Sequence, residues 1–247
     1  MSLAAGPSVE ASYSVQTMGV GVGNATLRLE QMAERLAARF RFETAALLGL
    51  VEKTDTRMET LASGLRDALS LERFVGVYEK EDRTREVDIT YGADGAIDAF
   101  ALKKRGSVRI NSVPAGLAAG TVDPIGAFLR ARSWLEQATV GSELAMSVFD
   151  GRKRYDTTLR YLGLTQVSTP HGGAPAHQVS VRYQLRQSLD EDSGTLEPEK
   201  NDRVRELQMT VSTDGRYVPL GVEGNFDGMP LTATLTADCA GPGGCPD

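Results

Sequence analysis

Apolar and polar residues alternate along almost every segment of this 247-residue chain. Successive side chains of a strand point to opposite faces, so this period of two predicts strands with one buried and one solvated face. Short polar turns between the segments favour antiparallel pairing. About twelve such segments indicate an all-β protein. They cover residues 9–15, 25–30, 36–42, 73–80, 85–91, 97–103, 143–149, 154–162, 177–187, 205–212, 217–223 and 231–238.

One segment departs from this period and predicts a helix over about 124–137. Asp123 is suited to cap the free amides of the first turn, and Pro124 has no amide to leave unpaired there. Ile125, Phe128, Leu129, Arg132 and Leu135 define one face of the helix. A helix inserted into a long antiparallel β chain favours a curved sheet with the helix against it.

Other segments carry weaker signals. Residues 58–69 combine helical spacing of apolar residues with Gly64 in the middle, so both a strand followed by a turn and a short helix stay open. Residues 104–120 and 188–203 are expected to be loops. No break in composition and no repeat divides the chain. We therefore expect one domain over 9–238, an N-terminal segment 1–8 that is disordered or foreign to the protein, and a Cys-flanked tail 239–247.

The net charge of −6 gives the chain no general attraction for phosphate backbones, which argues against nucleic acid as a partner. No apolar run approaches the roughly 18 residues that span a bilayer, so no transmembrane segment is expected. The N-terminus lacks a signal peptide: either the protein is not exported, or the peptide has been removed. Cys239 and Cys245 flank a Gly- and Pro-rich loop, which favours a disulfide over two free thiols and with it an oxidising compartment such as the periplasm.

Motifs that suggest chemistry at first sight do not support it. Gly19, Gly21 and Gly23 have GxGxG spacing and precede a strand, unlike a dinucleotide fingerprint. The segment His171-Gly172-Gly173 resembles an oxyanion loop, but the chain has no G-x-S-x-G elbow, and its place between Pro170 and Pro175 predicts a surface loop. His177 shares the apolar phase of its strand, and the acidic residues of 190–202 miss the EF-hand pattern. We therefore expect no enzyme, no metal site and no cofactor.

Several segments, in this order, resemble an exported Gram-negative family known as domain of unknown function 3108. They are Tyr13-Ser-Val with Gly19–Ala25, Ser70–Phe74 with Val77-Tyr-Glu, Arg85–Tyr91, Val113-Pro114, Val122–Arg130, Val148–Tyr155 and Val211–Leu220. The resemblance spans roughly residues 11–236. It implies a periplasmic protein with a half-open antiparallel barrel, similar to periplasmic lipoprotein carriers, with the helix across the concave side. It implies no catalytic residues.

A half-barrel with one helix leaves apolar inner surface uncovered, and such surface often marks a binding site. The leading hypothesis is a periplasmic protein that binds an apolar ligand, such as a lipid or acyl chain, without catalysis. The expected ligand residues are Phe40, Phe42, Ile89, Tyr91, Phe128 and Trp134, with a cleft near Trp134 and with Arg130, Arg132 or Arg154 for an anionic headgroup. The alternative is a structural or assembly protein of the cell envelope that binds another protein through the concave face.

Overall fold

The computed structural model describes residues 8–32, 34–44, 53–64, 69–81, 83–117, 119–199, 203–226 and 229–241. Within these ranges it contains fifteen strands and one helix. The first half comprises β1 (Ser8–Thr17), β2 (Val20–Met32), β3 (Arg35–Thr44), β4 (Thr54–Ser63), β5 (Ser70–Lys80), β6 (Arg83–Tyr91), β7 (Ile97–Lys104) and β8 (Ser107–Ile110). After them come α1 (Pro124–Leu135), β9 (Glu143–Phe149), β10 (Lys153–Thr169), β11 (Gly172–Leu189), β12 (Leu196–Pro198), β13 (Val204–Ser212), β14 (Pro219–Phe226) and β15 (Met229–Gly241).

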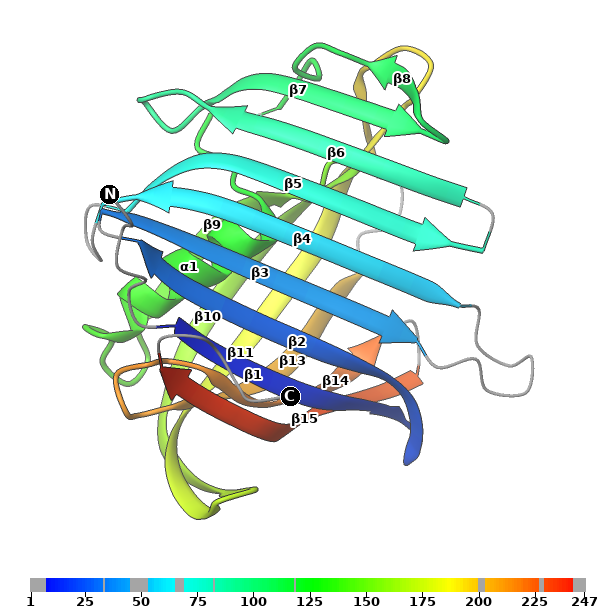
Figure 1. The fold of residues 1–247 in the computed structure, drawn as a ribbon. Helices are drawn as coiled ribbons and strands as arrows, with labels where there is room; N and C mark the ends of the chain where they lie inside the picture. The colour runs from blue at the N-terminus through cyan, green and yellow to red at the C-terminus, as the bar shows by residue number, and fades with distance from the viewer. Residues whose placement is uncertain are drawn as a thin grey trace, which may run out of the picture.

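All the strands belong to one antiparallel sheet that curls without closing. Their order is β8-β7-β6-β5-β4-β3-β2-β1-β15-β14-β13-β11-β10-β9, with β12 beside β11. The pairing of β1 with β15 joins the two halves of the chain, from Ser8 opposite Gly241 to Thr17 opposite Leu231. In Figure 1 the strands β1 to β8 lie in front, and β9, β10, β11 and β13 cross behind them. The predicted all-β, half-open antiparallel sheet is therefore confirmed.

Helix α1 lies on the concave side, between the two halves of the sheet (Figure 1). Asp123 caps it as predicted, because its carboxylate accepts a hydrogen bond from the amide of Gly126 at 2.7 Å. Ile125 and Leu129 belong to the larger core cluster, which they share with the inner residues of β1 to β8. Ala131 and Leu135 belong to a second cluster with Leu159, Tyr161, Val179 and Val211 from β10, β11 and β13. One helix thus buries apolar side chains against both halves of the sheet.

The outward faces of the first strands carry charged side chains in cross-strand pairs. Examples are Arg39 with Glu59 at 2.9 Å and Arg73 with Asp88 at 2.6 Å. Exposed pairs of this kind contribute little stability each, typically about 0–1 kcal/mol. Since successive side chains of a strand point to opposite faces, the alternate residues face inward. Ala25, Leu27 and Leu29 of β2 are examples, and all three are buried, as the alternation predicts.

The structure corrects several local predictions. Of the two alternatives for residues 58–69, the structure has the strand, because β4 continues to Ser63, and α1 ends at Leu135 rather than 137. The two expected loops, 104–120 and 188–203, contain the short strands β8 and β12. The segment Gly19–Gly23 needs no correction: it follows the hairpin turn at Met18-Gly19 and lies mostly in β2, which agrees with the rejection of a dinucleotide fingerprint.

The largest correction concerns the segment around His171, which was expected to be a surface loop. Here β10 and β11 form one long hairpin that extends to a turn at residues 170–171. Pro175 and Gly173 indicated a loop, yet both pair across this hairpin with β10. The neighbour β13 begins pairing only at Ala176, so this part of β11 has β10 alone beside it. Proline is tolerated at such strand edges because its missing amide need not face a partner.

Candidate functional site

A recess of about 410 Å³ opens between α1 and strands β1 to β3 on the concave side of the sheet. We call it the α1 recess. Its apolar lining consists of Val9, Leu29, Leu36, Leu69 and Leu129, and its polar lining of Gln31, Arg132, Ser133, Glu136 and Arg216, with Gly64 and Gly215. Ligand pockets typically have volumes of about 300–1,000 Å³, a mostly apolar lining and a few polar groups. The α1 recess lies within this range of volumes, and its lining combines five apolar with five polar residues.

The polar rim of the α1 recess is held by hydrogen bonds between elements. Arg132 Nη2 donates to the carbonyl oxygen of Arg216 at 2.8 Å and links α1 to the turn between β13 and β14. Arg216 in turn donates from Nη1 to Asp238 Oδ2 and from Nε to Asp214 Oδ2, both at 2.6 Å. Burial works to lower the pKa of Arg216, but its hydrogen bonds with Asp214 and Asp238 raise it overall. The rim therefore keeps guanidinium groups in defined positions.

The contact around Trp134, where the sequence predicted a cleft, is nearly filled. Phe128, Trp134 and Leu135 meet residues of β10, β11 and β13, and the space left among them is about 10 Å³. A cavity needs about 10–15 Å³ to hold one water molecule. An acyl chain has no room at this contact as it stands.

The other predicted ligand residues are spread over the molecule. Ile89 is fully buried in the core, and Tyr91 is buried with its hydroxyl bound to Asp123. Phe40 and Phe42 are partly buried on β3 and pack against the core. Arg130 is half-buried on α1. The structure brings Phe128 and Trp134 together at one contact, and of the nine predicted residues only Arg132 lines the α1 recess.

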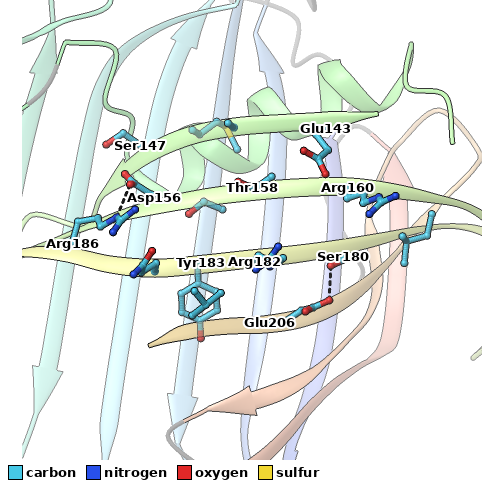
Figure 2. Close-up of a pocket in the computed structure, with 16 residues that line it drawn as sticks. Glu143, Ser147, Asp156, Thr158, Arg160, Ser180, Arg182, Tyr183, Arg186 and Glu206 are labelled. Carbon is cyan, nitrogen blue, oxygen red and sulfur yellow. Dashed lines mark hydrogen bonds and ion pairs between the residues drawn. The ribbon is translucent and has the colours of Figure 1, made fainter. Parts of the chain in front are cut away.

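Arg154 lies on the outward face of the second half of the sheet, away from the other predicted residues. Its Nε donates to Ser147 Oγ at 2.9 Å and its Nη1 to Gln187 Oε1 at 2.6 Å. Ser147 lines a second and larger hollow of about 870 Å³, formed by β9, β10, β11 and β13 (Figure 2). We call this hollow the outer groove. Its lining is mainly polar and charged, in contrast to that of the α1 recess.

Sequence reasoning missed the α1 recess because its walls come from distant segments. Leu29 and Leu36 were identified only as inward strand residues, and Arg132 as one of three headgroup candidates. No spacing in the sequence links these residues to Gly215 and Arg216. The only available signal was the shared inward phase of the leucines.

The two histidines have structural partners. Tyr161 Oη and His177 Nδ1 are 3.0 Å apart, the ring of His177 stacks on Tyr217, and burial lowers the pKa of His177. His171 Nε2 lies 2.9 Å from Asp238 Oδ1. In the described part of the chain, no group of three or more His, Cys, Asp and Glu side chains is placed to hold a metal ion. The helix found there is too short to cross a bilayer.

Comparison with known proteins identifies the family. The family described as "Protein of unknown function (DUF3108)" matches residues 12–235. The chain belongs to this family. This agrees with the resemblance drawn from the sequence motifs. No curated protein matches the chain.

Two solved structures are similar to this member of the DUF3108 family. A crystal structure of a "Beta-barrel-like Protein of Domain of Unknown Function DUF1849" from Brucella abortus has a TM-score of 0.59 at 12% identity, covering 98% of this chain and 99% of the other. A "putative lipoprotein" from Parabacteroides distasonis has a TM-score of 0.38 at 8% identity, with 94% of each chain covered. The first similarity shows a shared fold and no more.

Proposed function

We propose that this DUF3108 protein is an exported, non-catalytic binding protein that holds an apolar ligand, such as a lipid or acyl chain, in the α1 recess. The observation that supports this most is the composition of the recess: five apolar side chains beneath a rim of guanidinium, carboxylate and amide groups. This arrangement matches a ligand with one apolar and one polar end.

The apolar side chains at the floor of the recess supply the driving force for ligand binding. Val9, Leu36 and Leu69 are only partly buried, whereas Leu29 and Leu129 are fully buried beneath them. A ligand that covers the partly buried side chains removes apolar surface from water, which is worth about 2.5 kcal/mol for roughly 100 Å². An acyl chain brings apolar surface of its own to the same contact.

The arginines of the polar rim orient the bound ligand. Arg132 and Arg216 both line the recess, and Arg132 donates a hydrogen bond to the carbonyl oxygen of Arg216. A carboxylate or phosphate at the ligand's polar end forms charge-assisted hydrogen bonds with such groups. We therefore place the headgroup at these two arginines instead of at Arg130 or Arg154.

The periplasm is the compartment that we propose, because the family resemblance implies export and a Cys239–Cys245 disulfide needs an oxidising environment. Cys239 lies in β15 opposite Glu10, and Cys245 falls outside the described residues, so the disulfide stays a prediction. A second candidate function, binding of another envelope protein, is favoured by the outer groove, whose polar lining suits a polypeptide better than a lipid.

Isothermal titration calorimetry with lauric acid and with lysophosphatidylcholine tests the proposal. We expect saturable binding of one ligand per chain. The variant Ser133→Phe introduces a large side chain from α1 into the recess and is expected to abolish binding. The matched control, Ser107→Phe, makes the same change at an exposed position of β8 and should bind like the parent protein.

A second variant keeps the test decisive if Ser133→Phe fails to fold. Leu36→Gln places an amide on the half-buried floor and should weaken binding about tenfold without filling the recess. Circular dichroism would verify that each variant keeps its β structure. Equal affinity of the parent, Ser133→Phe and Leu36→Gln proteins would reject the α1 recess as the site. Absence of any binding up to the solubility of both ligands would reject the apolar-ligand function.

A further inference from the structure

The outer groove lies on the face of the sheet that points away from α1 (Figure 2). Its residues occupy adjacent places in the strand registers. Glu143, Arg160 and Ser180 form one row across β9, β10 and β11. Ala145, Thr158, Arg182 and Glu206 form the next row, which continues onto β13. Arg160 and Arg182 are therefore diagonal neighbours on the outward face of the sheet.

Three of the six charged residues that line the groove have partners within it. Asp156 accepts from Arg186 Nε at 2.7 Å and from Arg154 Nη2 at 3.3 Å. Arg182 of β11 lies directly opposite Glu206 of β13. The carboxylate of Glu206 nevertheless accepts its hydrogen bond from Ser180 Oγ, at 2.8 Å. Arg160 and Arg182 are exposed and have no hydrogen-bond or ion-pair partner among the described residues. Two adjacent guanidinium groups are thus available to an external anion.

The groove is bordered by an open strand edge. β9 is the last strand in the order of the sheet, and beyond it only a single bridge, Val122 with Val148, was found in the described chain. This bridge lies at the end of β9, so the part from Glu143 to Met146 has no strand beside it. Such an edge presents amide and carbonyl groups that can pair with an added strand.

From these observations, we propose that the outer groove binds an extended acidic polypeptide segment, which adds to the edge of β9 and directs carboxylates toward Arg160 and Arg182. A strand paired with β9 lies two strand spacings, about 10 Å, from Arg160 in β10. Long Arg and Glu side chains cover this distance together. Arg182 lies one strand further, in β11 at about 14 Å, and attracts the acidic segment without direct contact. The edge favours a polypeptide over an anionic polysaccharide because only a polypeptide supplies the complementary backbone hydrogen bonds.

This site is separate from the α1 recess, since the two share no lining residue: the recess lies between α1 and strands β1 to β3, and the outer groove is formed by β9, β10, β11 and β13. The proposal goes beyond the apolar-ligand function and rests on the second candidate function, for which it names the chemistry of the partner. An apolar ligand and a polypeptide partner can bind the protein at the same time without competing for side chains.

Fluorescence anisotropy of a labelled eight-residue peptide of alternating Glu and Val tests the proposal with the full chain. We expect binding that weakens with salt and is absent for the corresponding Lys-Val peptide. Arg160→Gln and Arg182→Gln should each weaken binding about three- to fivefold, in the range of an exposed ion pair. Arg109→Gln, which removes an exposed charge from β8, is the matched control and should leave the affinity unchanged.

Two further measurements separate the parts of the proposal. Glu143→Gln removes a carboxylate beside Arg160 and should strengthen binding of the acidic peptide. A copy of the peptide that is N-methylated at alternate residues keeps its charge but cannot pair with a strand edge, and should bind at least tenfold more weakly. Equal binding by the arginine variants and the parent would overturn the site. If the methylated peptide bound as tightly as the unmodified peptide, or polygalacturonate bound more tightly than it, the proposal that the ligand is a polypeptide paired with β9 would be wrong.

Discussion

Tyr91 and Asp123 exchange two hydrogen bonds. The hydroxyl of Tyr91 donates to Asp123 Oδ2 at 3.0 Å and accepts from the backbone amide of Asp123 at 2.8 Å. Thr60 Oγ1 donates to the other carboxylate oxygen at 2.7 Å. Since Thr60 lies in β4 and Tyr91 in β6, these buried bonds fix the start of α1 against the first half of the sheet. The position of α1, and with it one wall of the α1 recess, depends on them.

Removal of either donor should destabilise the protein. Tyr91→Phe leaves Asp123 Oδ2 and the backbone amide of Asp123 without these partners, which costs about 1–3 kcal/mol. Thr60→Val removes one of the two donors to Asp123 Oδ1 and leaves the amide of Gly126, so its cost is smaller, about 0.5–1.5 kcal/mol. Urea unfolding followed by circular dichroism measures this loss. An unchanged free energy of unfolding in both variants would contradict the role of this network.

The ionisation of Asp123 should make stability depend on pH. Burial raises the pKa of this carboxyl above its ordinary value of 3.8, although hydrogen bonds from Gly126, Thr60 and Tyr91 oppose the rise. Between pH 3.8 and the raised pKa, the folded state holds a proton that the unfolded chain has released. Stability from this group is therefore fully present below pH 3.8 and is lost as the pH rises through the raised pKa.

Asp123→Asn is the matched comparison for this effect, because it removes the titration and keeps a side chain suited to the N-cap. We expect the stability advantage of the parent over Asp123→Asn to be largest near pH 3.8 and to shrink toward neutral pH. Unfolding curves at several pH values measure it. An advantage that grows with pH would indicate a lowered pKa instead.

Gly151 is expected to resist substitution more than Gly215. Both have positive φ, +86° and +81°, which costs a non-glycine residue about 1–2 kcal/mol. A Cβ at Gly151 would also lie 2.4 Å from Val87 Cγ1, whereas a Cβ at Gly215 meets nothing within 4 Å. Thermal unfolding should therefore show Gly151→Ala to be less stable than Gly215→Ala by about 1–3 kcal/mol, the cost of overpacking. Equal losses would show that the contact with Val87 relaxes freely.

The disulfide between Cys239 and Cys245 is tested by thiol titration of the denatured, unreduced protein. We expect no reactive thiol after expression with export to an oxidising compartment. Reduction should change global stability little, because stabilisation by loop closure is smaller for short loops. Two reactive thiols per chain would contradict the pairing.

Local signals account for the parts of the fold that the sequence predicted. The cap formed by Asp123 and Pro124 lies within one turn, and alternation such as Ala25, Leu27 and Leu29 is set within one strand. The hairpin extension through Pro175 was missed because its edge position depends on where β13 ends. The bond between Tyr91 and Asp123 was missed for a similar reason: alternation indicated only that Tyr91 faces inward.

The candidate site was less predictable than the fold. Alternation correctly indicated that Ile89 and Tyr91 face inward, but not that α1 and neighbouring side chains cover them. Whether an inner residue is core or recess depends on where the helix lies and on side chains from both halves of the sheet. Leu36 and Ile89 have the same pattern in the sequence, yet Leu36 lines the α1 recess and Ile89 is fully buried.

Native mass spectrometry of the protein, purified from its own cell envelope without detergent, tests the central claim most directly. The account predicts a species heavier than the 26.5 kDa chain by the mass of one apolar ligand, and its loss in Ser133→Phe but not in Ser107→Phe. Parent protein found only at the mass of the chain alone, or an equal ligand load in Ser133→Phe, would contradict binding in the α1 recess.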